Sequence, residues 1–131
     1  MIYFDSSAIM KLIRREVETD ALITWLNERP QQAVATSELG RIEVLRAAHR
    51  LGERVLAEAR AVMDDLDLVP LDRTVQDMAC ELGTSVLRTL DALHLASALL
   101  IADELTDFVA YDQRLIEAAT AVSLPVRVPG R

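Results

Sequence analysis

The chain begins Met1-Ile2-Tyr3-Phe4-Asp5-Ser6-Ser7-Ala8, and this stretch decides the fold that we expect. Ile2 to Phe4 form a short apolar run without alternation, which is typical of a strand buried on both faces of a sheet. Asp5 ends this run, and a helical pattern follows it. We expect the strand to lie inside a parallel sheet, with Asp5 at its carboxyl end, where open α/β sheets bind ligands.

The rest of the chain alternates strand-like and helix-like segments. Further strands are expected at 32–36, 68–71 (an edge strand, given its proline), 108–111 and 126–128. Helices are expected at 6–14, 19–28, 36–51, 53–65, 72–83, 90–102 and 114–121, with a connection over 84–88. The expected N-caps are Ser6 or Ser7, Thr19, Thr36 or Ser37, Asp72 and Thr89. The alternation predicts one α/β domain over residues 1–131, with a mostly parallel central sheet flanked by helices.

The composition bounds the kind of protein. The 131 residues suffice for one domain, and 51% hydrophobic with 27% charged residues indicates a globular chain. We expect no membrane span, because no apolar run approaches ~18 residues. Cys80 is the single cysteine and no signal peptide is apparent, which favours the cytoplasm. The net charge of -7 argues against binding nucleic acid through a basic field, but not against a nuclease whose acids hold metal ions.

Three aspartates stand where a purely structural role is hard to assign. Asp5 and Asp112 each end an expected strand, and both strands would deliver their carboxylates to the same edge of a parallel sheet. Each is also a good N-cap, which is the alternative reading. Asp91 lies in the first turn of the most apolar helix, where the helix dipole alone would favour it. A buried helix start rarely keeps a charge unless it is paired or bound to a metal.

Two further residues are candidates for the site, but each also has a purely structural explanation. Glu43 lies in the middle of a helix, where a pair with Arg46 is the simpler reading of its spacing. His94 follows Asp91 by three residues and is either a proton-transfer group, a donor to a ligand-binding residue, or a satisfied core histidine. Together, Asp5, Glu43, Asp91 and Asp112 would form an all-oxygen pocket, which hard cations such as Mg²⁺ and Mn²⁺ prefer.

Four segments in order resemble those of PIN-domain proteins, and the length resembles the VapC toxins of bacterial toxin–antitoxin pairs. They are Ile2–Ala8, Arg41-Ile42-Glu43-Val44-Leu45-Arg46-Ala47, Leu90-Asp91-Ala92-Leu93-His94-Leu95-Ala96-Ser97-Ala98 and Tyr111-Asp112-Gln113-Arg114-Leu115. The chain departs from the family at Ala110, where the family often has Thr or Ser.

The resemblance implies an Mg²⁺- or Mn²⁺-dependent endoribonuclease that leaves 5′-phosphate and 3′-hydroxyl ends. Asp5 and Asp91 would bind the metal directly, Glu43 and Asp112 would complete the site, and Ser7 would support Asp5. It also implies a homodimer that a small antitoxin holds inactive. RNA would be held by local basic residues, for which the candidates are Lys11, Arg14, Arg15, Arg41, Arg46 and Arg88.

Two other functions remain open from the residues. The chain could be a PIN-like module that binds a protein partner without catalysis, its acids serving only as caps or weak metal ligands. Asp5 could also be a phospho-acceptor, but the residues that follow it are Ser6 and Ser7 rather than a second acid.

Overall fold

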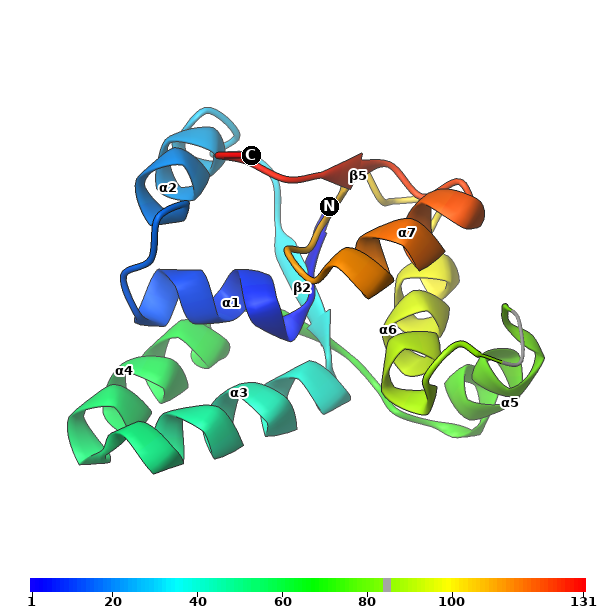
Figure 1. The fold of residues 1–131 in the computed structure, drawn as a ribbon, viewed down its shortest axis with the longest axis horizontal. Coiled ribbons are helices and arrows are strands. Elements are labelled where there is room, and N and C mark those ends of the chain that lie inside the picture. The colour runs from blue at the N-terminus through cyan, green and yellow to red at the C-terminus, as the bar shows by residue number, and fades with distance from the viewer. Residues whose placement is uncertain (84–85) are drawn as a thin grey trace.

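A computed structural model gives the structure of the chain, and it describes residues 1–83 and 86–131. Residues 84 and 85, at the start of the connection expected over 84–88, lie outside the described residues. Within the described part, the chain forms an α/β fold in which helices cover both faces of one sheet (Figure 1). None of the helices in these ranges is long and apolar enough to cross a membrane.

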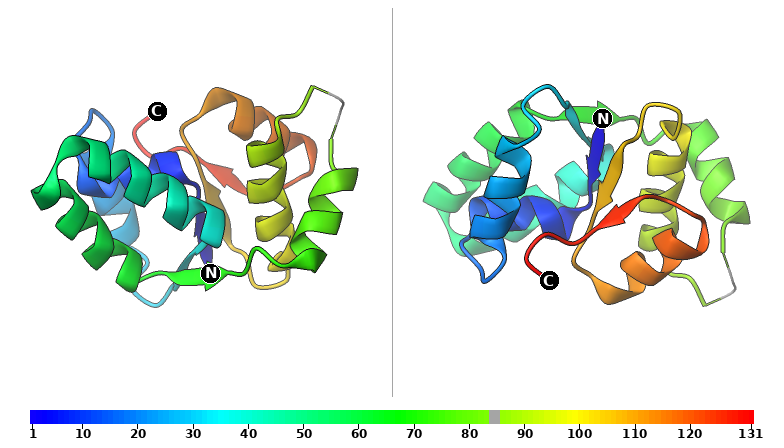
Figure 2. Two further views of the ribbon diagram at one scale, coloured as in Figure 1. Left: turned by 90° about the horizontal axis from the view of Figure 1, so that it is seen from below. Right: turned by 90° about the horizontal axis from the view of Figure 1, so that it is seen from above.

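The sheet has five strands in the order β3-β2-β1-β4-β5, and every pairing between neighbours is parallel. The strands are β1 (Ile2–Phe4), β2 (Val34–Ser37), β3 (Asp67–Val69), β4 (Asp107–Val109) and β5 (Val126–Arg127). Figure 2 shows β1 in the middle of the sheet, with the helices in two groups on either side. The parallel sheet and the edge position of β3 confirm the sequence-based expectations.

The helices cover the sheet unequally. They are α1 (Ser6–Ile13), α2 (Thr19–Asn27), α3 (Glu38–Leu51), α4 (Glu53–Asp64), α5 (Arg73–Glu81), α6 (Thr89–Leu100) and α7 (Gln113–Ala121). The first four cover one face, whereas α6 and α7 cover the other and α5 packs on the outer side of α6 (Figure 1). The expected central helix, α6, buries its middle residues 94–98, while Leu90 and Leu100 near its ends are exposed.

Alternation along β1 assigns its side chains to two cores. Ile2 and Phe4 pack with the α1–α4 layer, and Tyr3 packs with the α6–α7 layer. All three are fully buried. Successive side chains of a strand point to opposite faces, so Tyr3 is directed from the central strand toward α6.

The structure corrects three of the expected N-caps. Asp5, rather than Ser6 or Ser7, caps α1, because its backbone is extended and its side chain accepts a hydrogen bond from the Ala8 N–H at 2.9 Å. The cap positions of α2 and α6 are Glu18 and Arg88, one residue before the expected Thr19 and Thr89, and neither side chain caps its helix. Ser37 and Asp72 cap α3 and α5 as expected.

Candidate active site

Three of the four expected acids line one pocket at the carboxyl end of the sheet. The pocket has a volume of about 570 Å³ and is lined by Glu43, Arg88, Thr89, Leu90, Asp91, Asp112 and Arg114. Its carboxylates come from separate elements, since Glu43 lies on α3, Asp91 in the first turn of α6, and Asp112 at the N-cap of α7. Residues far apart in sequence are therefore brought together by the crossing of α3, α6 and α7.

Asp5, the fourth expected acid, does not line this pocket but is buried at the end of β1, with 3% of its surface exposed. The Ser7 hydroxyl donates to its carboxylate, with Oγ lying 2.7 and 2.8 Å from the two oxygens. The same Ser7 oxygen accepts a hydrogen bond from the Tyr111 N–H at 3.0 Å. Ser7 therefore ties the end of β1 to the segment that carries Asp112.

Burial and neighbouring carboxylates raise the pKa of two of the acids, Asp5 and Asp91. Burial raises the pKa of Asp5 to about 6, and the Glu43 carboxylate adds to the shift, although hydrogen bonds from Ser7 and Ala8 and the nearby His94 oppose it. Burial also raises the pKa of Asp91, with further contributions from Asp112 and Glu43. A cation would relieve both burial and repulsion, and an all-carboxylate donor set suits a hard divalent ion. In its chemistry the set of acids fits Mg²⁺ or Mn²⁺.

The acids are nevertheless turned toward separate partners. No three His, Cys, Asp or Glu side chains among the described residues are grouped closely enough to hold a metal ion as they stand. Asp5 accepts from Ser7 and Ala8, Asp112 accepts from the Leu115 N–H at 3.1 Å, and Glu43 is bonded to His94. Because an ionised carboxylate has about four acceptor sites, these bonds leave room for a cation after side-chain rotation.

Glu43 has a different partner from the one that its spacing suggested. Its Oε1 lies 2.7 Å from Nε2 of His94, and within the described chain no ion pair joins it to Arg46. His94 is itself buried, and its Nδ1 lies 2.7 Å from the Tyr3 hydroxyl. His94 is thus a satisfied core residue, as one reading held, but it also contacts an acid of the pocket.

Two arginines stand at the mouth of the pocket. Arg88 was expected to lie near the site and does so, whereas Arg114 was not singled out. The signal that could have found it is its place in the first turn of α7, where the helix dipole disfavours a positive charge. Lys11, another expected basic residue, is buried in ion pairs with Glu16 and Glu18 at 2.7 and 3.1 Å. Its ammonium group is therefore engaged away from the pocket.

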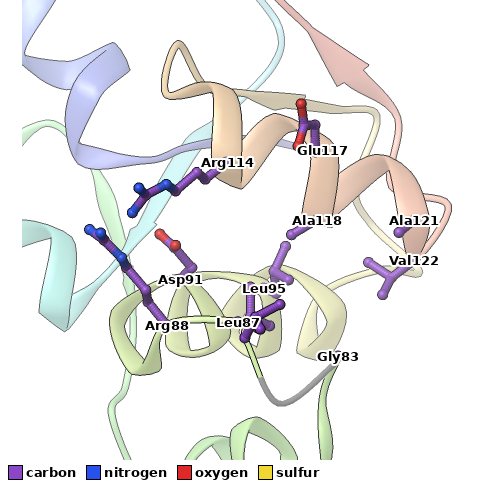
Figure 3. A pocket seen from close by; sticks show the side chains of 11 residues that line it. Gly83, Leu87, Arg88, Asp91, Leu95, Arg114, Glu117, Ala118, Ala121 and Val122 are labelled. Carbon is purple, nitrogen blue, oxygen red and sulfur yellow. The ribbon is translucent and has the colours of Figure 1, made fainter.

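A second, more apolar cavity adjoins the first. It has a volume of about 640 Å³ and shares Arg88, Asp91 and Arg114 with the acidic pocket. Figure 3 shows these three side chains at one end of the cavity, while Leu95, Val122 and other apolar side chains lie along α6 and α7. Together the two cavities place carboxylates and arginines at one end of a partly apolar space. This arrangement suits a bound phosphate flanked by less polar groups.

Comparison with known proteins places the whole chain among related sequences and folds. The model of the PIN domain family matches residues 2–121. The chain is 44% identical to ribonuclease VapC47 of Mycobacterium tuberculosis (strain CDC 1551 / Oshkosh), over 99% of this chain and 98% of that protein. Its fold resembles the crystal structure of Mycobacterium tuberculosis VapC20, a sarcin-ricin loop cleaving toxin, with a TM-score of 0.72 and 16% identity over 95% of this chain and 96% of that chain. It also resembles the crystal structure of VapBC2 from Rickettsia felis bound to a promoter DNA fragment, with a TM-score of 0.71 and 15% identity over 98% of this chain and 99% of that chain.

Proposed function

Because this chain belongs to the PIN-domain family, we propose that it is a metal-dependent endoribonuclease and the toxin of a type II toxin–antitoxin pair. The observation that carries the proposal is the convergence of Glu43, Asp91 and Asp112 on one pocket, with Asp5 buried close by. The naming of a 44% identical relative as a ribonuclease supports the same activity. We propose that residues 1–131 act as one PIN domain, which the family match over most of that range supports.

Asp5, Glu43, Asp91 and Asp112 would hold one or more Mg²⁺ or Mn²⁺ ions. Such an ion lowers the pKa of bound water and stabilises negative charge on a phosphate. Within the chain, Ser7 orients Asp5 through its hydroxyl, and α7 fixes Asp112 through the Leu115 N–H. These bonds attach Asp5 and Asp112 to rigid elements of the fold, and the acid side chains would turn toward the ion when it binds.

Arg88 and Arg114 would bind the RNA phosphates. Both line the same pocket as the acids, and Arg88 lowers the pKa of Asp91, although burial outweighs this effect. In a chain with a net charge of -7, positive charge beside the acids would supply local attraction for RNA. The arginine fork suits the oxygens of a phosphate group.

A small antitoxin protein would be the partner in the cell, and the protein would act as a homodimer in the cytoplasm. The similarity in fold to the VapBC2 structure from Rickettsia felis, together with the VapC name of the more closely related protein, supports the antitoxin partner. The single cysteine, Cys80, favours a reducing compartment.

The experiment that tests this function is cleavage of total cellular RNA by the purified chain with Mg²⁺, Mn²⁺ or EDTA. Asp91→Asn is the active-site variant, and Asp72→Asn is its matched control. Asp72 caps α5 through the Val75 N–H at 3.1 Å and does not line the acidic pocket. We expect discrete fragments from the parent and from Asp72→Asn in the presence of metal, and none from Asp91→Asn or with EDTA.

Circular dichroism and thermal unfolding would show that each variant is folded. Equal cleavage by the parent and Asp91→Asn would refute the assigned site. If the folded, antitoxin-free parent cleaves no RNA with either metal, the enzyme proposal fails, and a PIN-like module that binds a protein partner becomes the better account.

A further inference from the structure

A buried chain of hydrogen bonds runs from the middle of the sheet to the acidic pocket. It joins the Tyr3 hydroxyl on β1 to Nδ1 of His94 on α6, and Nε2 of His94 to Oε1 of Glu43 on α3, with both contacts at 2.7 Å. We propose that Tyr3 and His94 are positioning residues that hold the Glu43 carboxylate toward the metal-binding pocket. The inference rests on the proposed function, because it assigns Glu43 to the metal site.

The direction of the hydrogens follows from the groups at the two ends. An ionised carboxylate only accepts, so Nε2 of His94 must carry the hydrogen that it shares with Glu43. In a neutral ring Nδ1 is then an acceptor, and the Tyr3 hydroxyl donates to it. Burial and the nearby Asp5 charge raise the pKa of Tyr3, which keeps its hydroxyl protonated. Each end of the chain therefore selects the same imidazole tautomer.

Packing fixes the two rings in place. The Tyr3 ring stacks on Phe108 with centroids 5.3 Å apart, and the His94 ring meets it edge-on at 6.0 Å. On the α3 side, the absence of a side chain at Gly40 lets the helix pack closely against Thr36 of β2, because a Cβ there would collide with Thr36 Oγ1, whereas it would make an ordinary contact with His94 Cε1 at 3.4 Å. The rigid sheet is thereby coupled to a carboxylate on another helix.

The Glu43 end of this series of hydrogen bonds distinguishes a positioning role from ordinary core packing. The His94 side chain is 4% exposed, whereas that of Glu43 is 28% exposed and lines the pocket. No hydrogen bond within the described residues occupies the second carboxylate oxygen, Oε2. The imidazole thus holds one oxygen of Glu43 and leaves the other available in the pocket. When a group that hydrogen-bonds a metal-binding side chain is removed, the metal affinity commonly falls 10–100-fold.

The first test reads the tautomer of His94 by nitrogen NMR of the metal-free chain in mildly alkaline buffer. The sequence has two histidines, and the exposed His49 provides an internal reference for a ring without a fixed tautomer. We expect His94 to carry its hydrogen on Nε2 in the parent, and to lose part of this preference in Tyr3→Phe. A His94 ring with its hydrogen on Nδ1 alone would overturn the proposal.

The second test measures Mn²⁺ binding by calorimetry, without RNA. The amide of Gln reaches about as far as Nε2 of a histidine, whereas that of Asn reaches only about as far as Nδ1. We therefore expect His94→Gln to retain most of the Mn²⁺ affinity, and His94→Asn to lose about tenfold or more. Tyr3→Phe should also weaken binding.

Tyr111→Phe is the matched control for Tyr3→Phe, because the Tyr111 hydroxyl donates to the Pro129 carbonyl and, among the residues that the structure describes, forms no hydrogen bond with an acid of the pocket. It should leave Mn²⁺ affinity unchanged. If the parent binds Mn²⁺ and all four variants bind it equally well, the positioning role is wrong while the proposed function stands. A parent that binds no Mn²⁺ refutes the metal site itself, and the positioning role with it.

Discussion

Asp5→Asn should make the metal-free protein more stable at neutral pH while abolishing RNA cleavage. Asp5 is almost fully buried at the end of β1, and its pKa is raised from 3.8 to about 6, chiefly by burial. A raised carboxyl pKa means that the folded chain binds this proton more tightly than the unfolded chain does. The free energy of unfolding therefore falls as the pH rises from 3.8 to about 6, and levels off above that value.

The size of this effect follows from the shift in pKa. A change from 3.8 to about 6 corresponds to a loss of about 3 kcal/mol of stability. Asparagine removes the titration and remains a good N-cap for α1. The difference in unfolding free energy between Asp5→Asn and the parent should thus grow by about 3 kcal/mol across this pH range.

Urea denaturation in EDTA over this pH range would measure the difference. A difference that stays constant with pH would refute the reasoning, because it would show that Asp5 ionises as easily in the folded chain as in the unfolded chain. A second measurement adds Mg²⁺ to the same denaturation experiment. At a hundred times its dissociation constant it should stabilise the parent by about 2.7 kcal/mol, and it should stabilise Asp5→Asn much less.

Three further predictions test other parts of the structure. Asp112→Ser keeps an N-cap hydroxyl on α7, so it should lower the unfolding free energy in urea by less than about 1 kcal/mol but lose Mn²⁺ binding. The control Asp72→Ser should keep Mn²⁺ binding. Equal Mn²⁺ binding by the two variants would mean that Asp112 is a cap only. Gly40→Ala should destabilise the fold by about 1–3 kcal/mol, because its Cβ would lie 2.4 Å from the buried Thr36 Oγ1, and unchanged thermal unfolding would contradict this. The pKa of Glu18 is lowered from 4.5 by the two basic side chains that bind it, so its contribution to stability is present above pH 4.5 and lost as the pH falls through the folded value. Glu18→Gln should therefore flatten the acid limb of the stability profile, and an unchanged limb would show that the pairs are too weak to matter.

Much of the fold could be predicted from local pattern. The apolar run before Asp5 and the alternation of strand-like and helix-like segments indicated a parallel α/β sheet, because buried strands and amphipathic helices have different periods. The placement of Asp112 after β4 followed from the same logic, since parallel strands deliver their carboxyl ends to one edge. The role of Glu43 needed the family resemblance, because its spacing alone favoured Arg46.

The same short-range logic was weakest at the helix starts. An aspartate and a serine are about equally good N-caps, so the sequence could not say whether Asp5 or its neighbours would cap α1. The structure gives Asp5 the cap and leaves the Ser7 hydroxyl free to bond the carboxylate. Capping by Asp5 and Asp112 is compatible with metal binding, because each cap bond occupies only part of a carboxylate.

What the sequence determined by itself was the order of the elements and the strand ends that carry Asp5 and Asp112, because these depend on periodicity and on residues close together in the chain. The tertiary structure alone decided that Lys11 is buried with Glu18 and that Glu43 meets His94, 51 residues away. Such pairings depend on how the helices pack on the sheet and on one another. The periodicity of the sequence does not encode them, because these partners are set by the packing of whole elements.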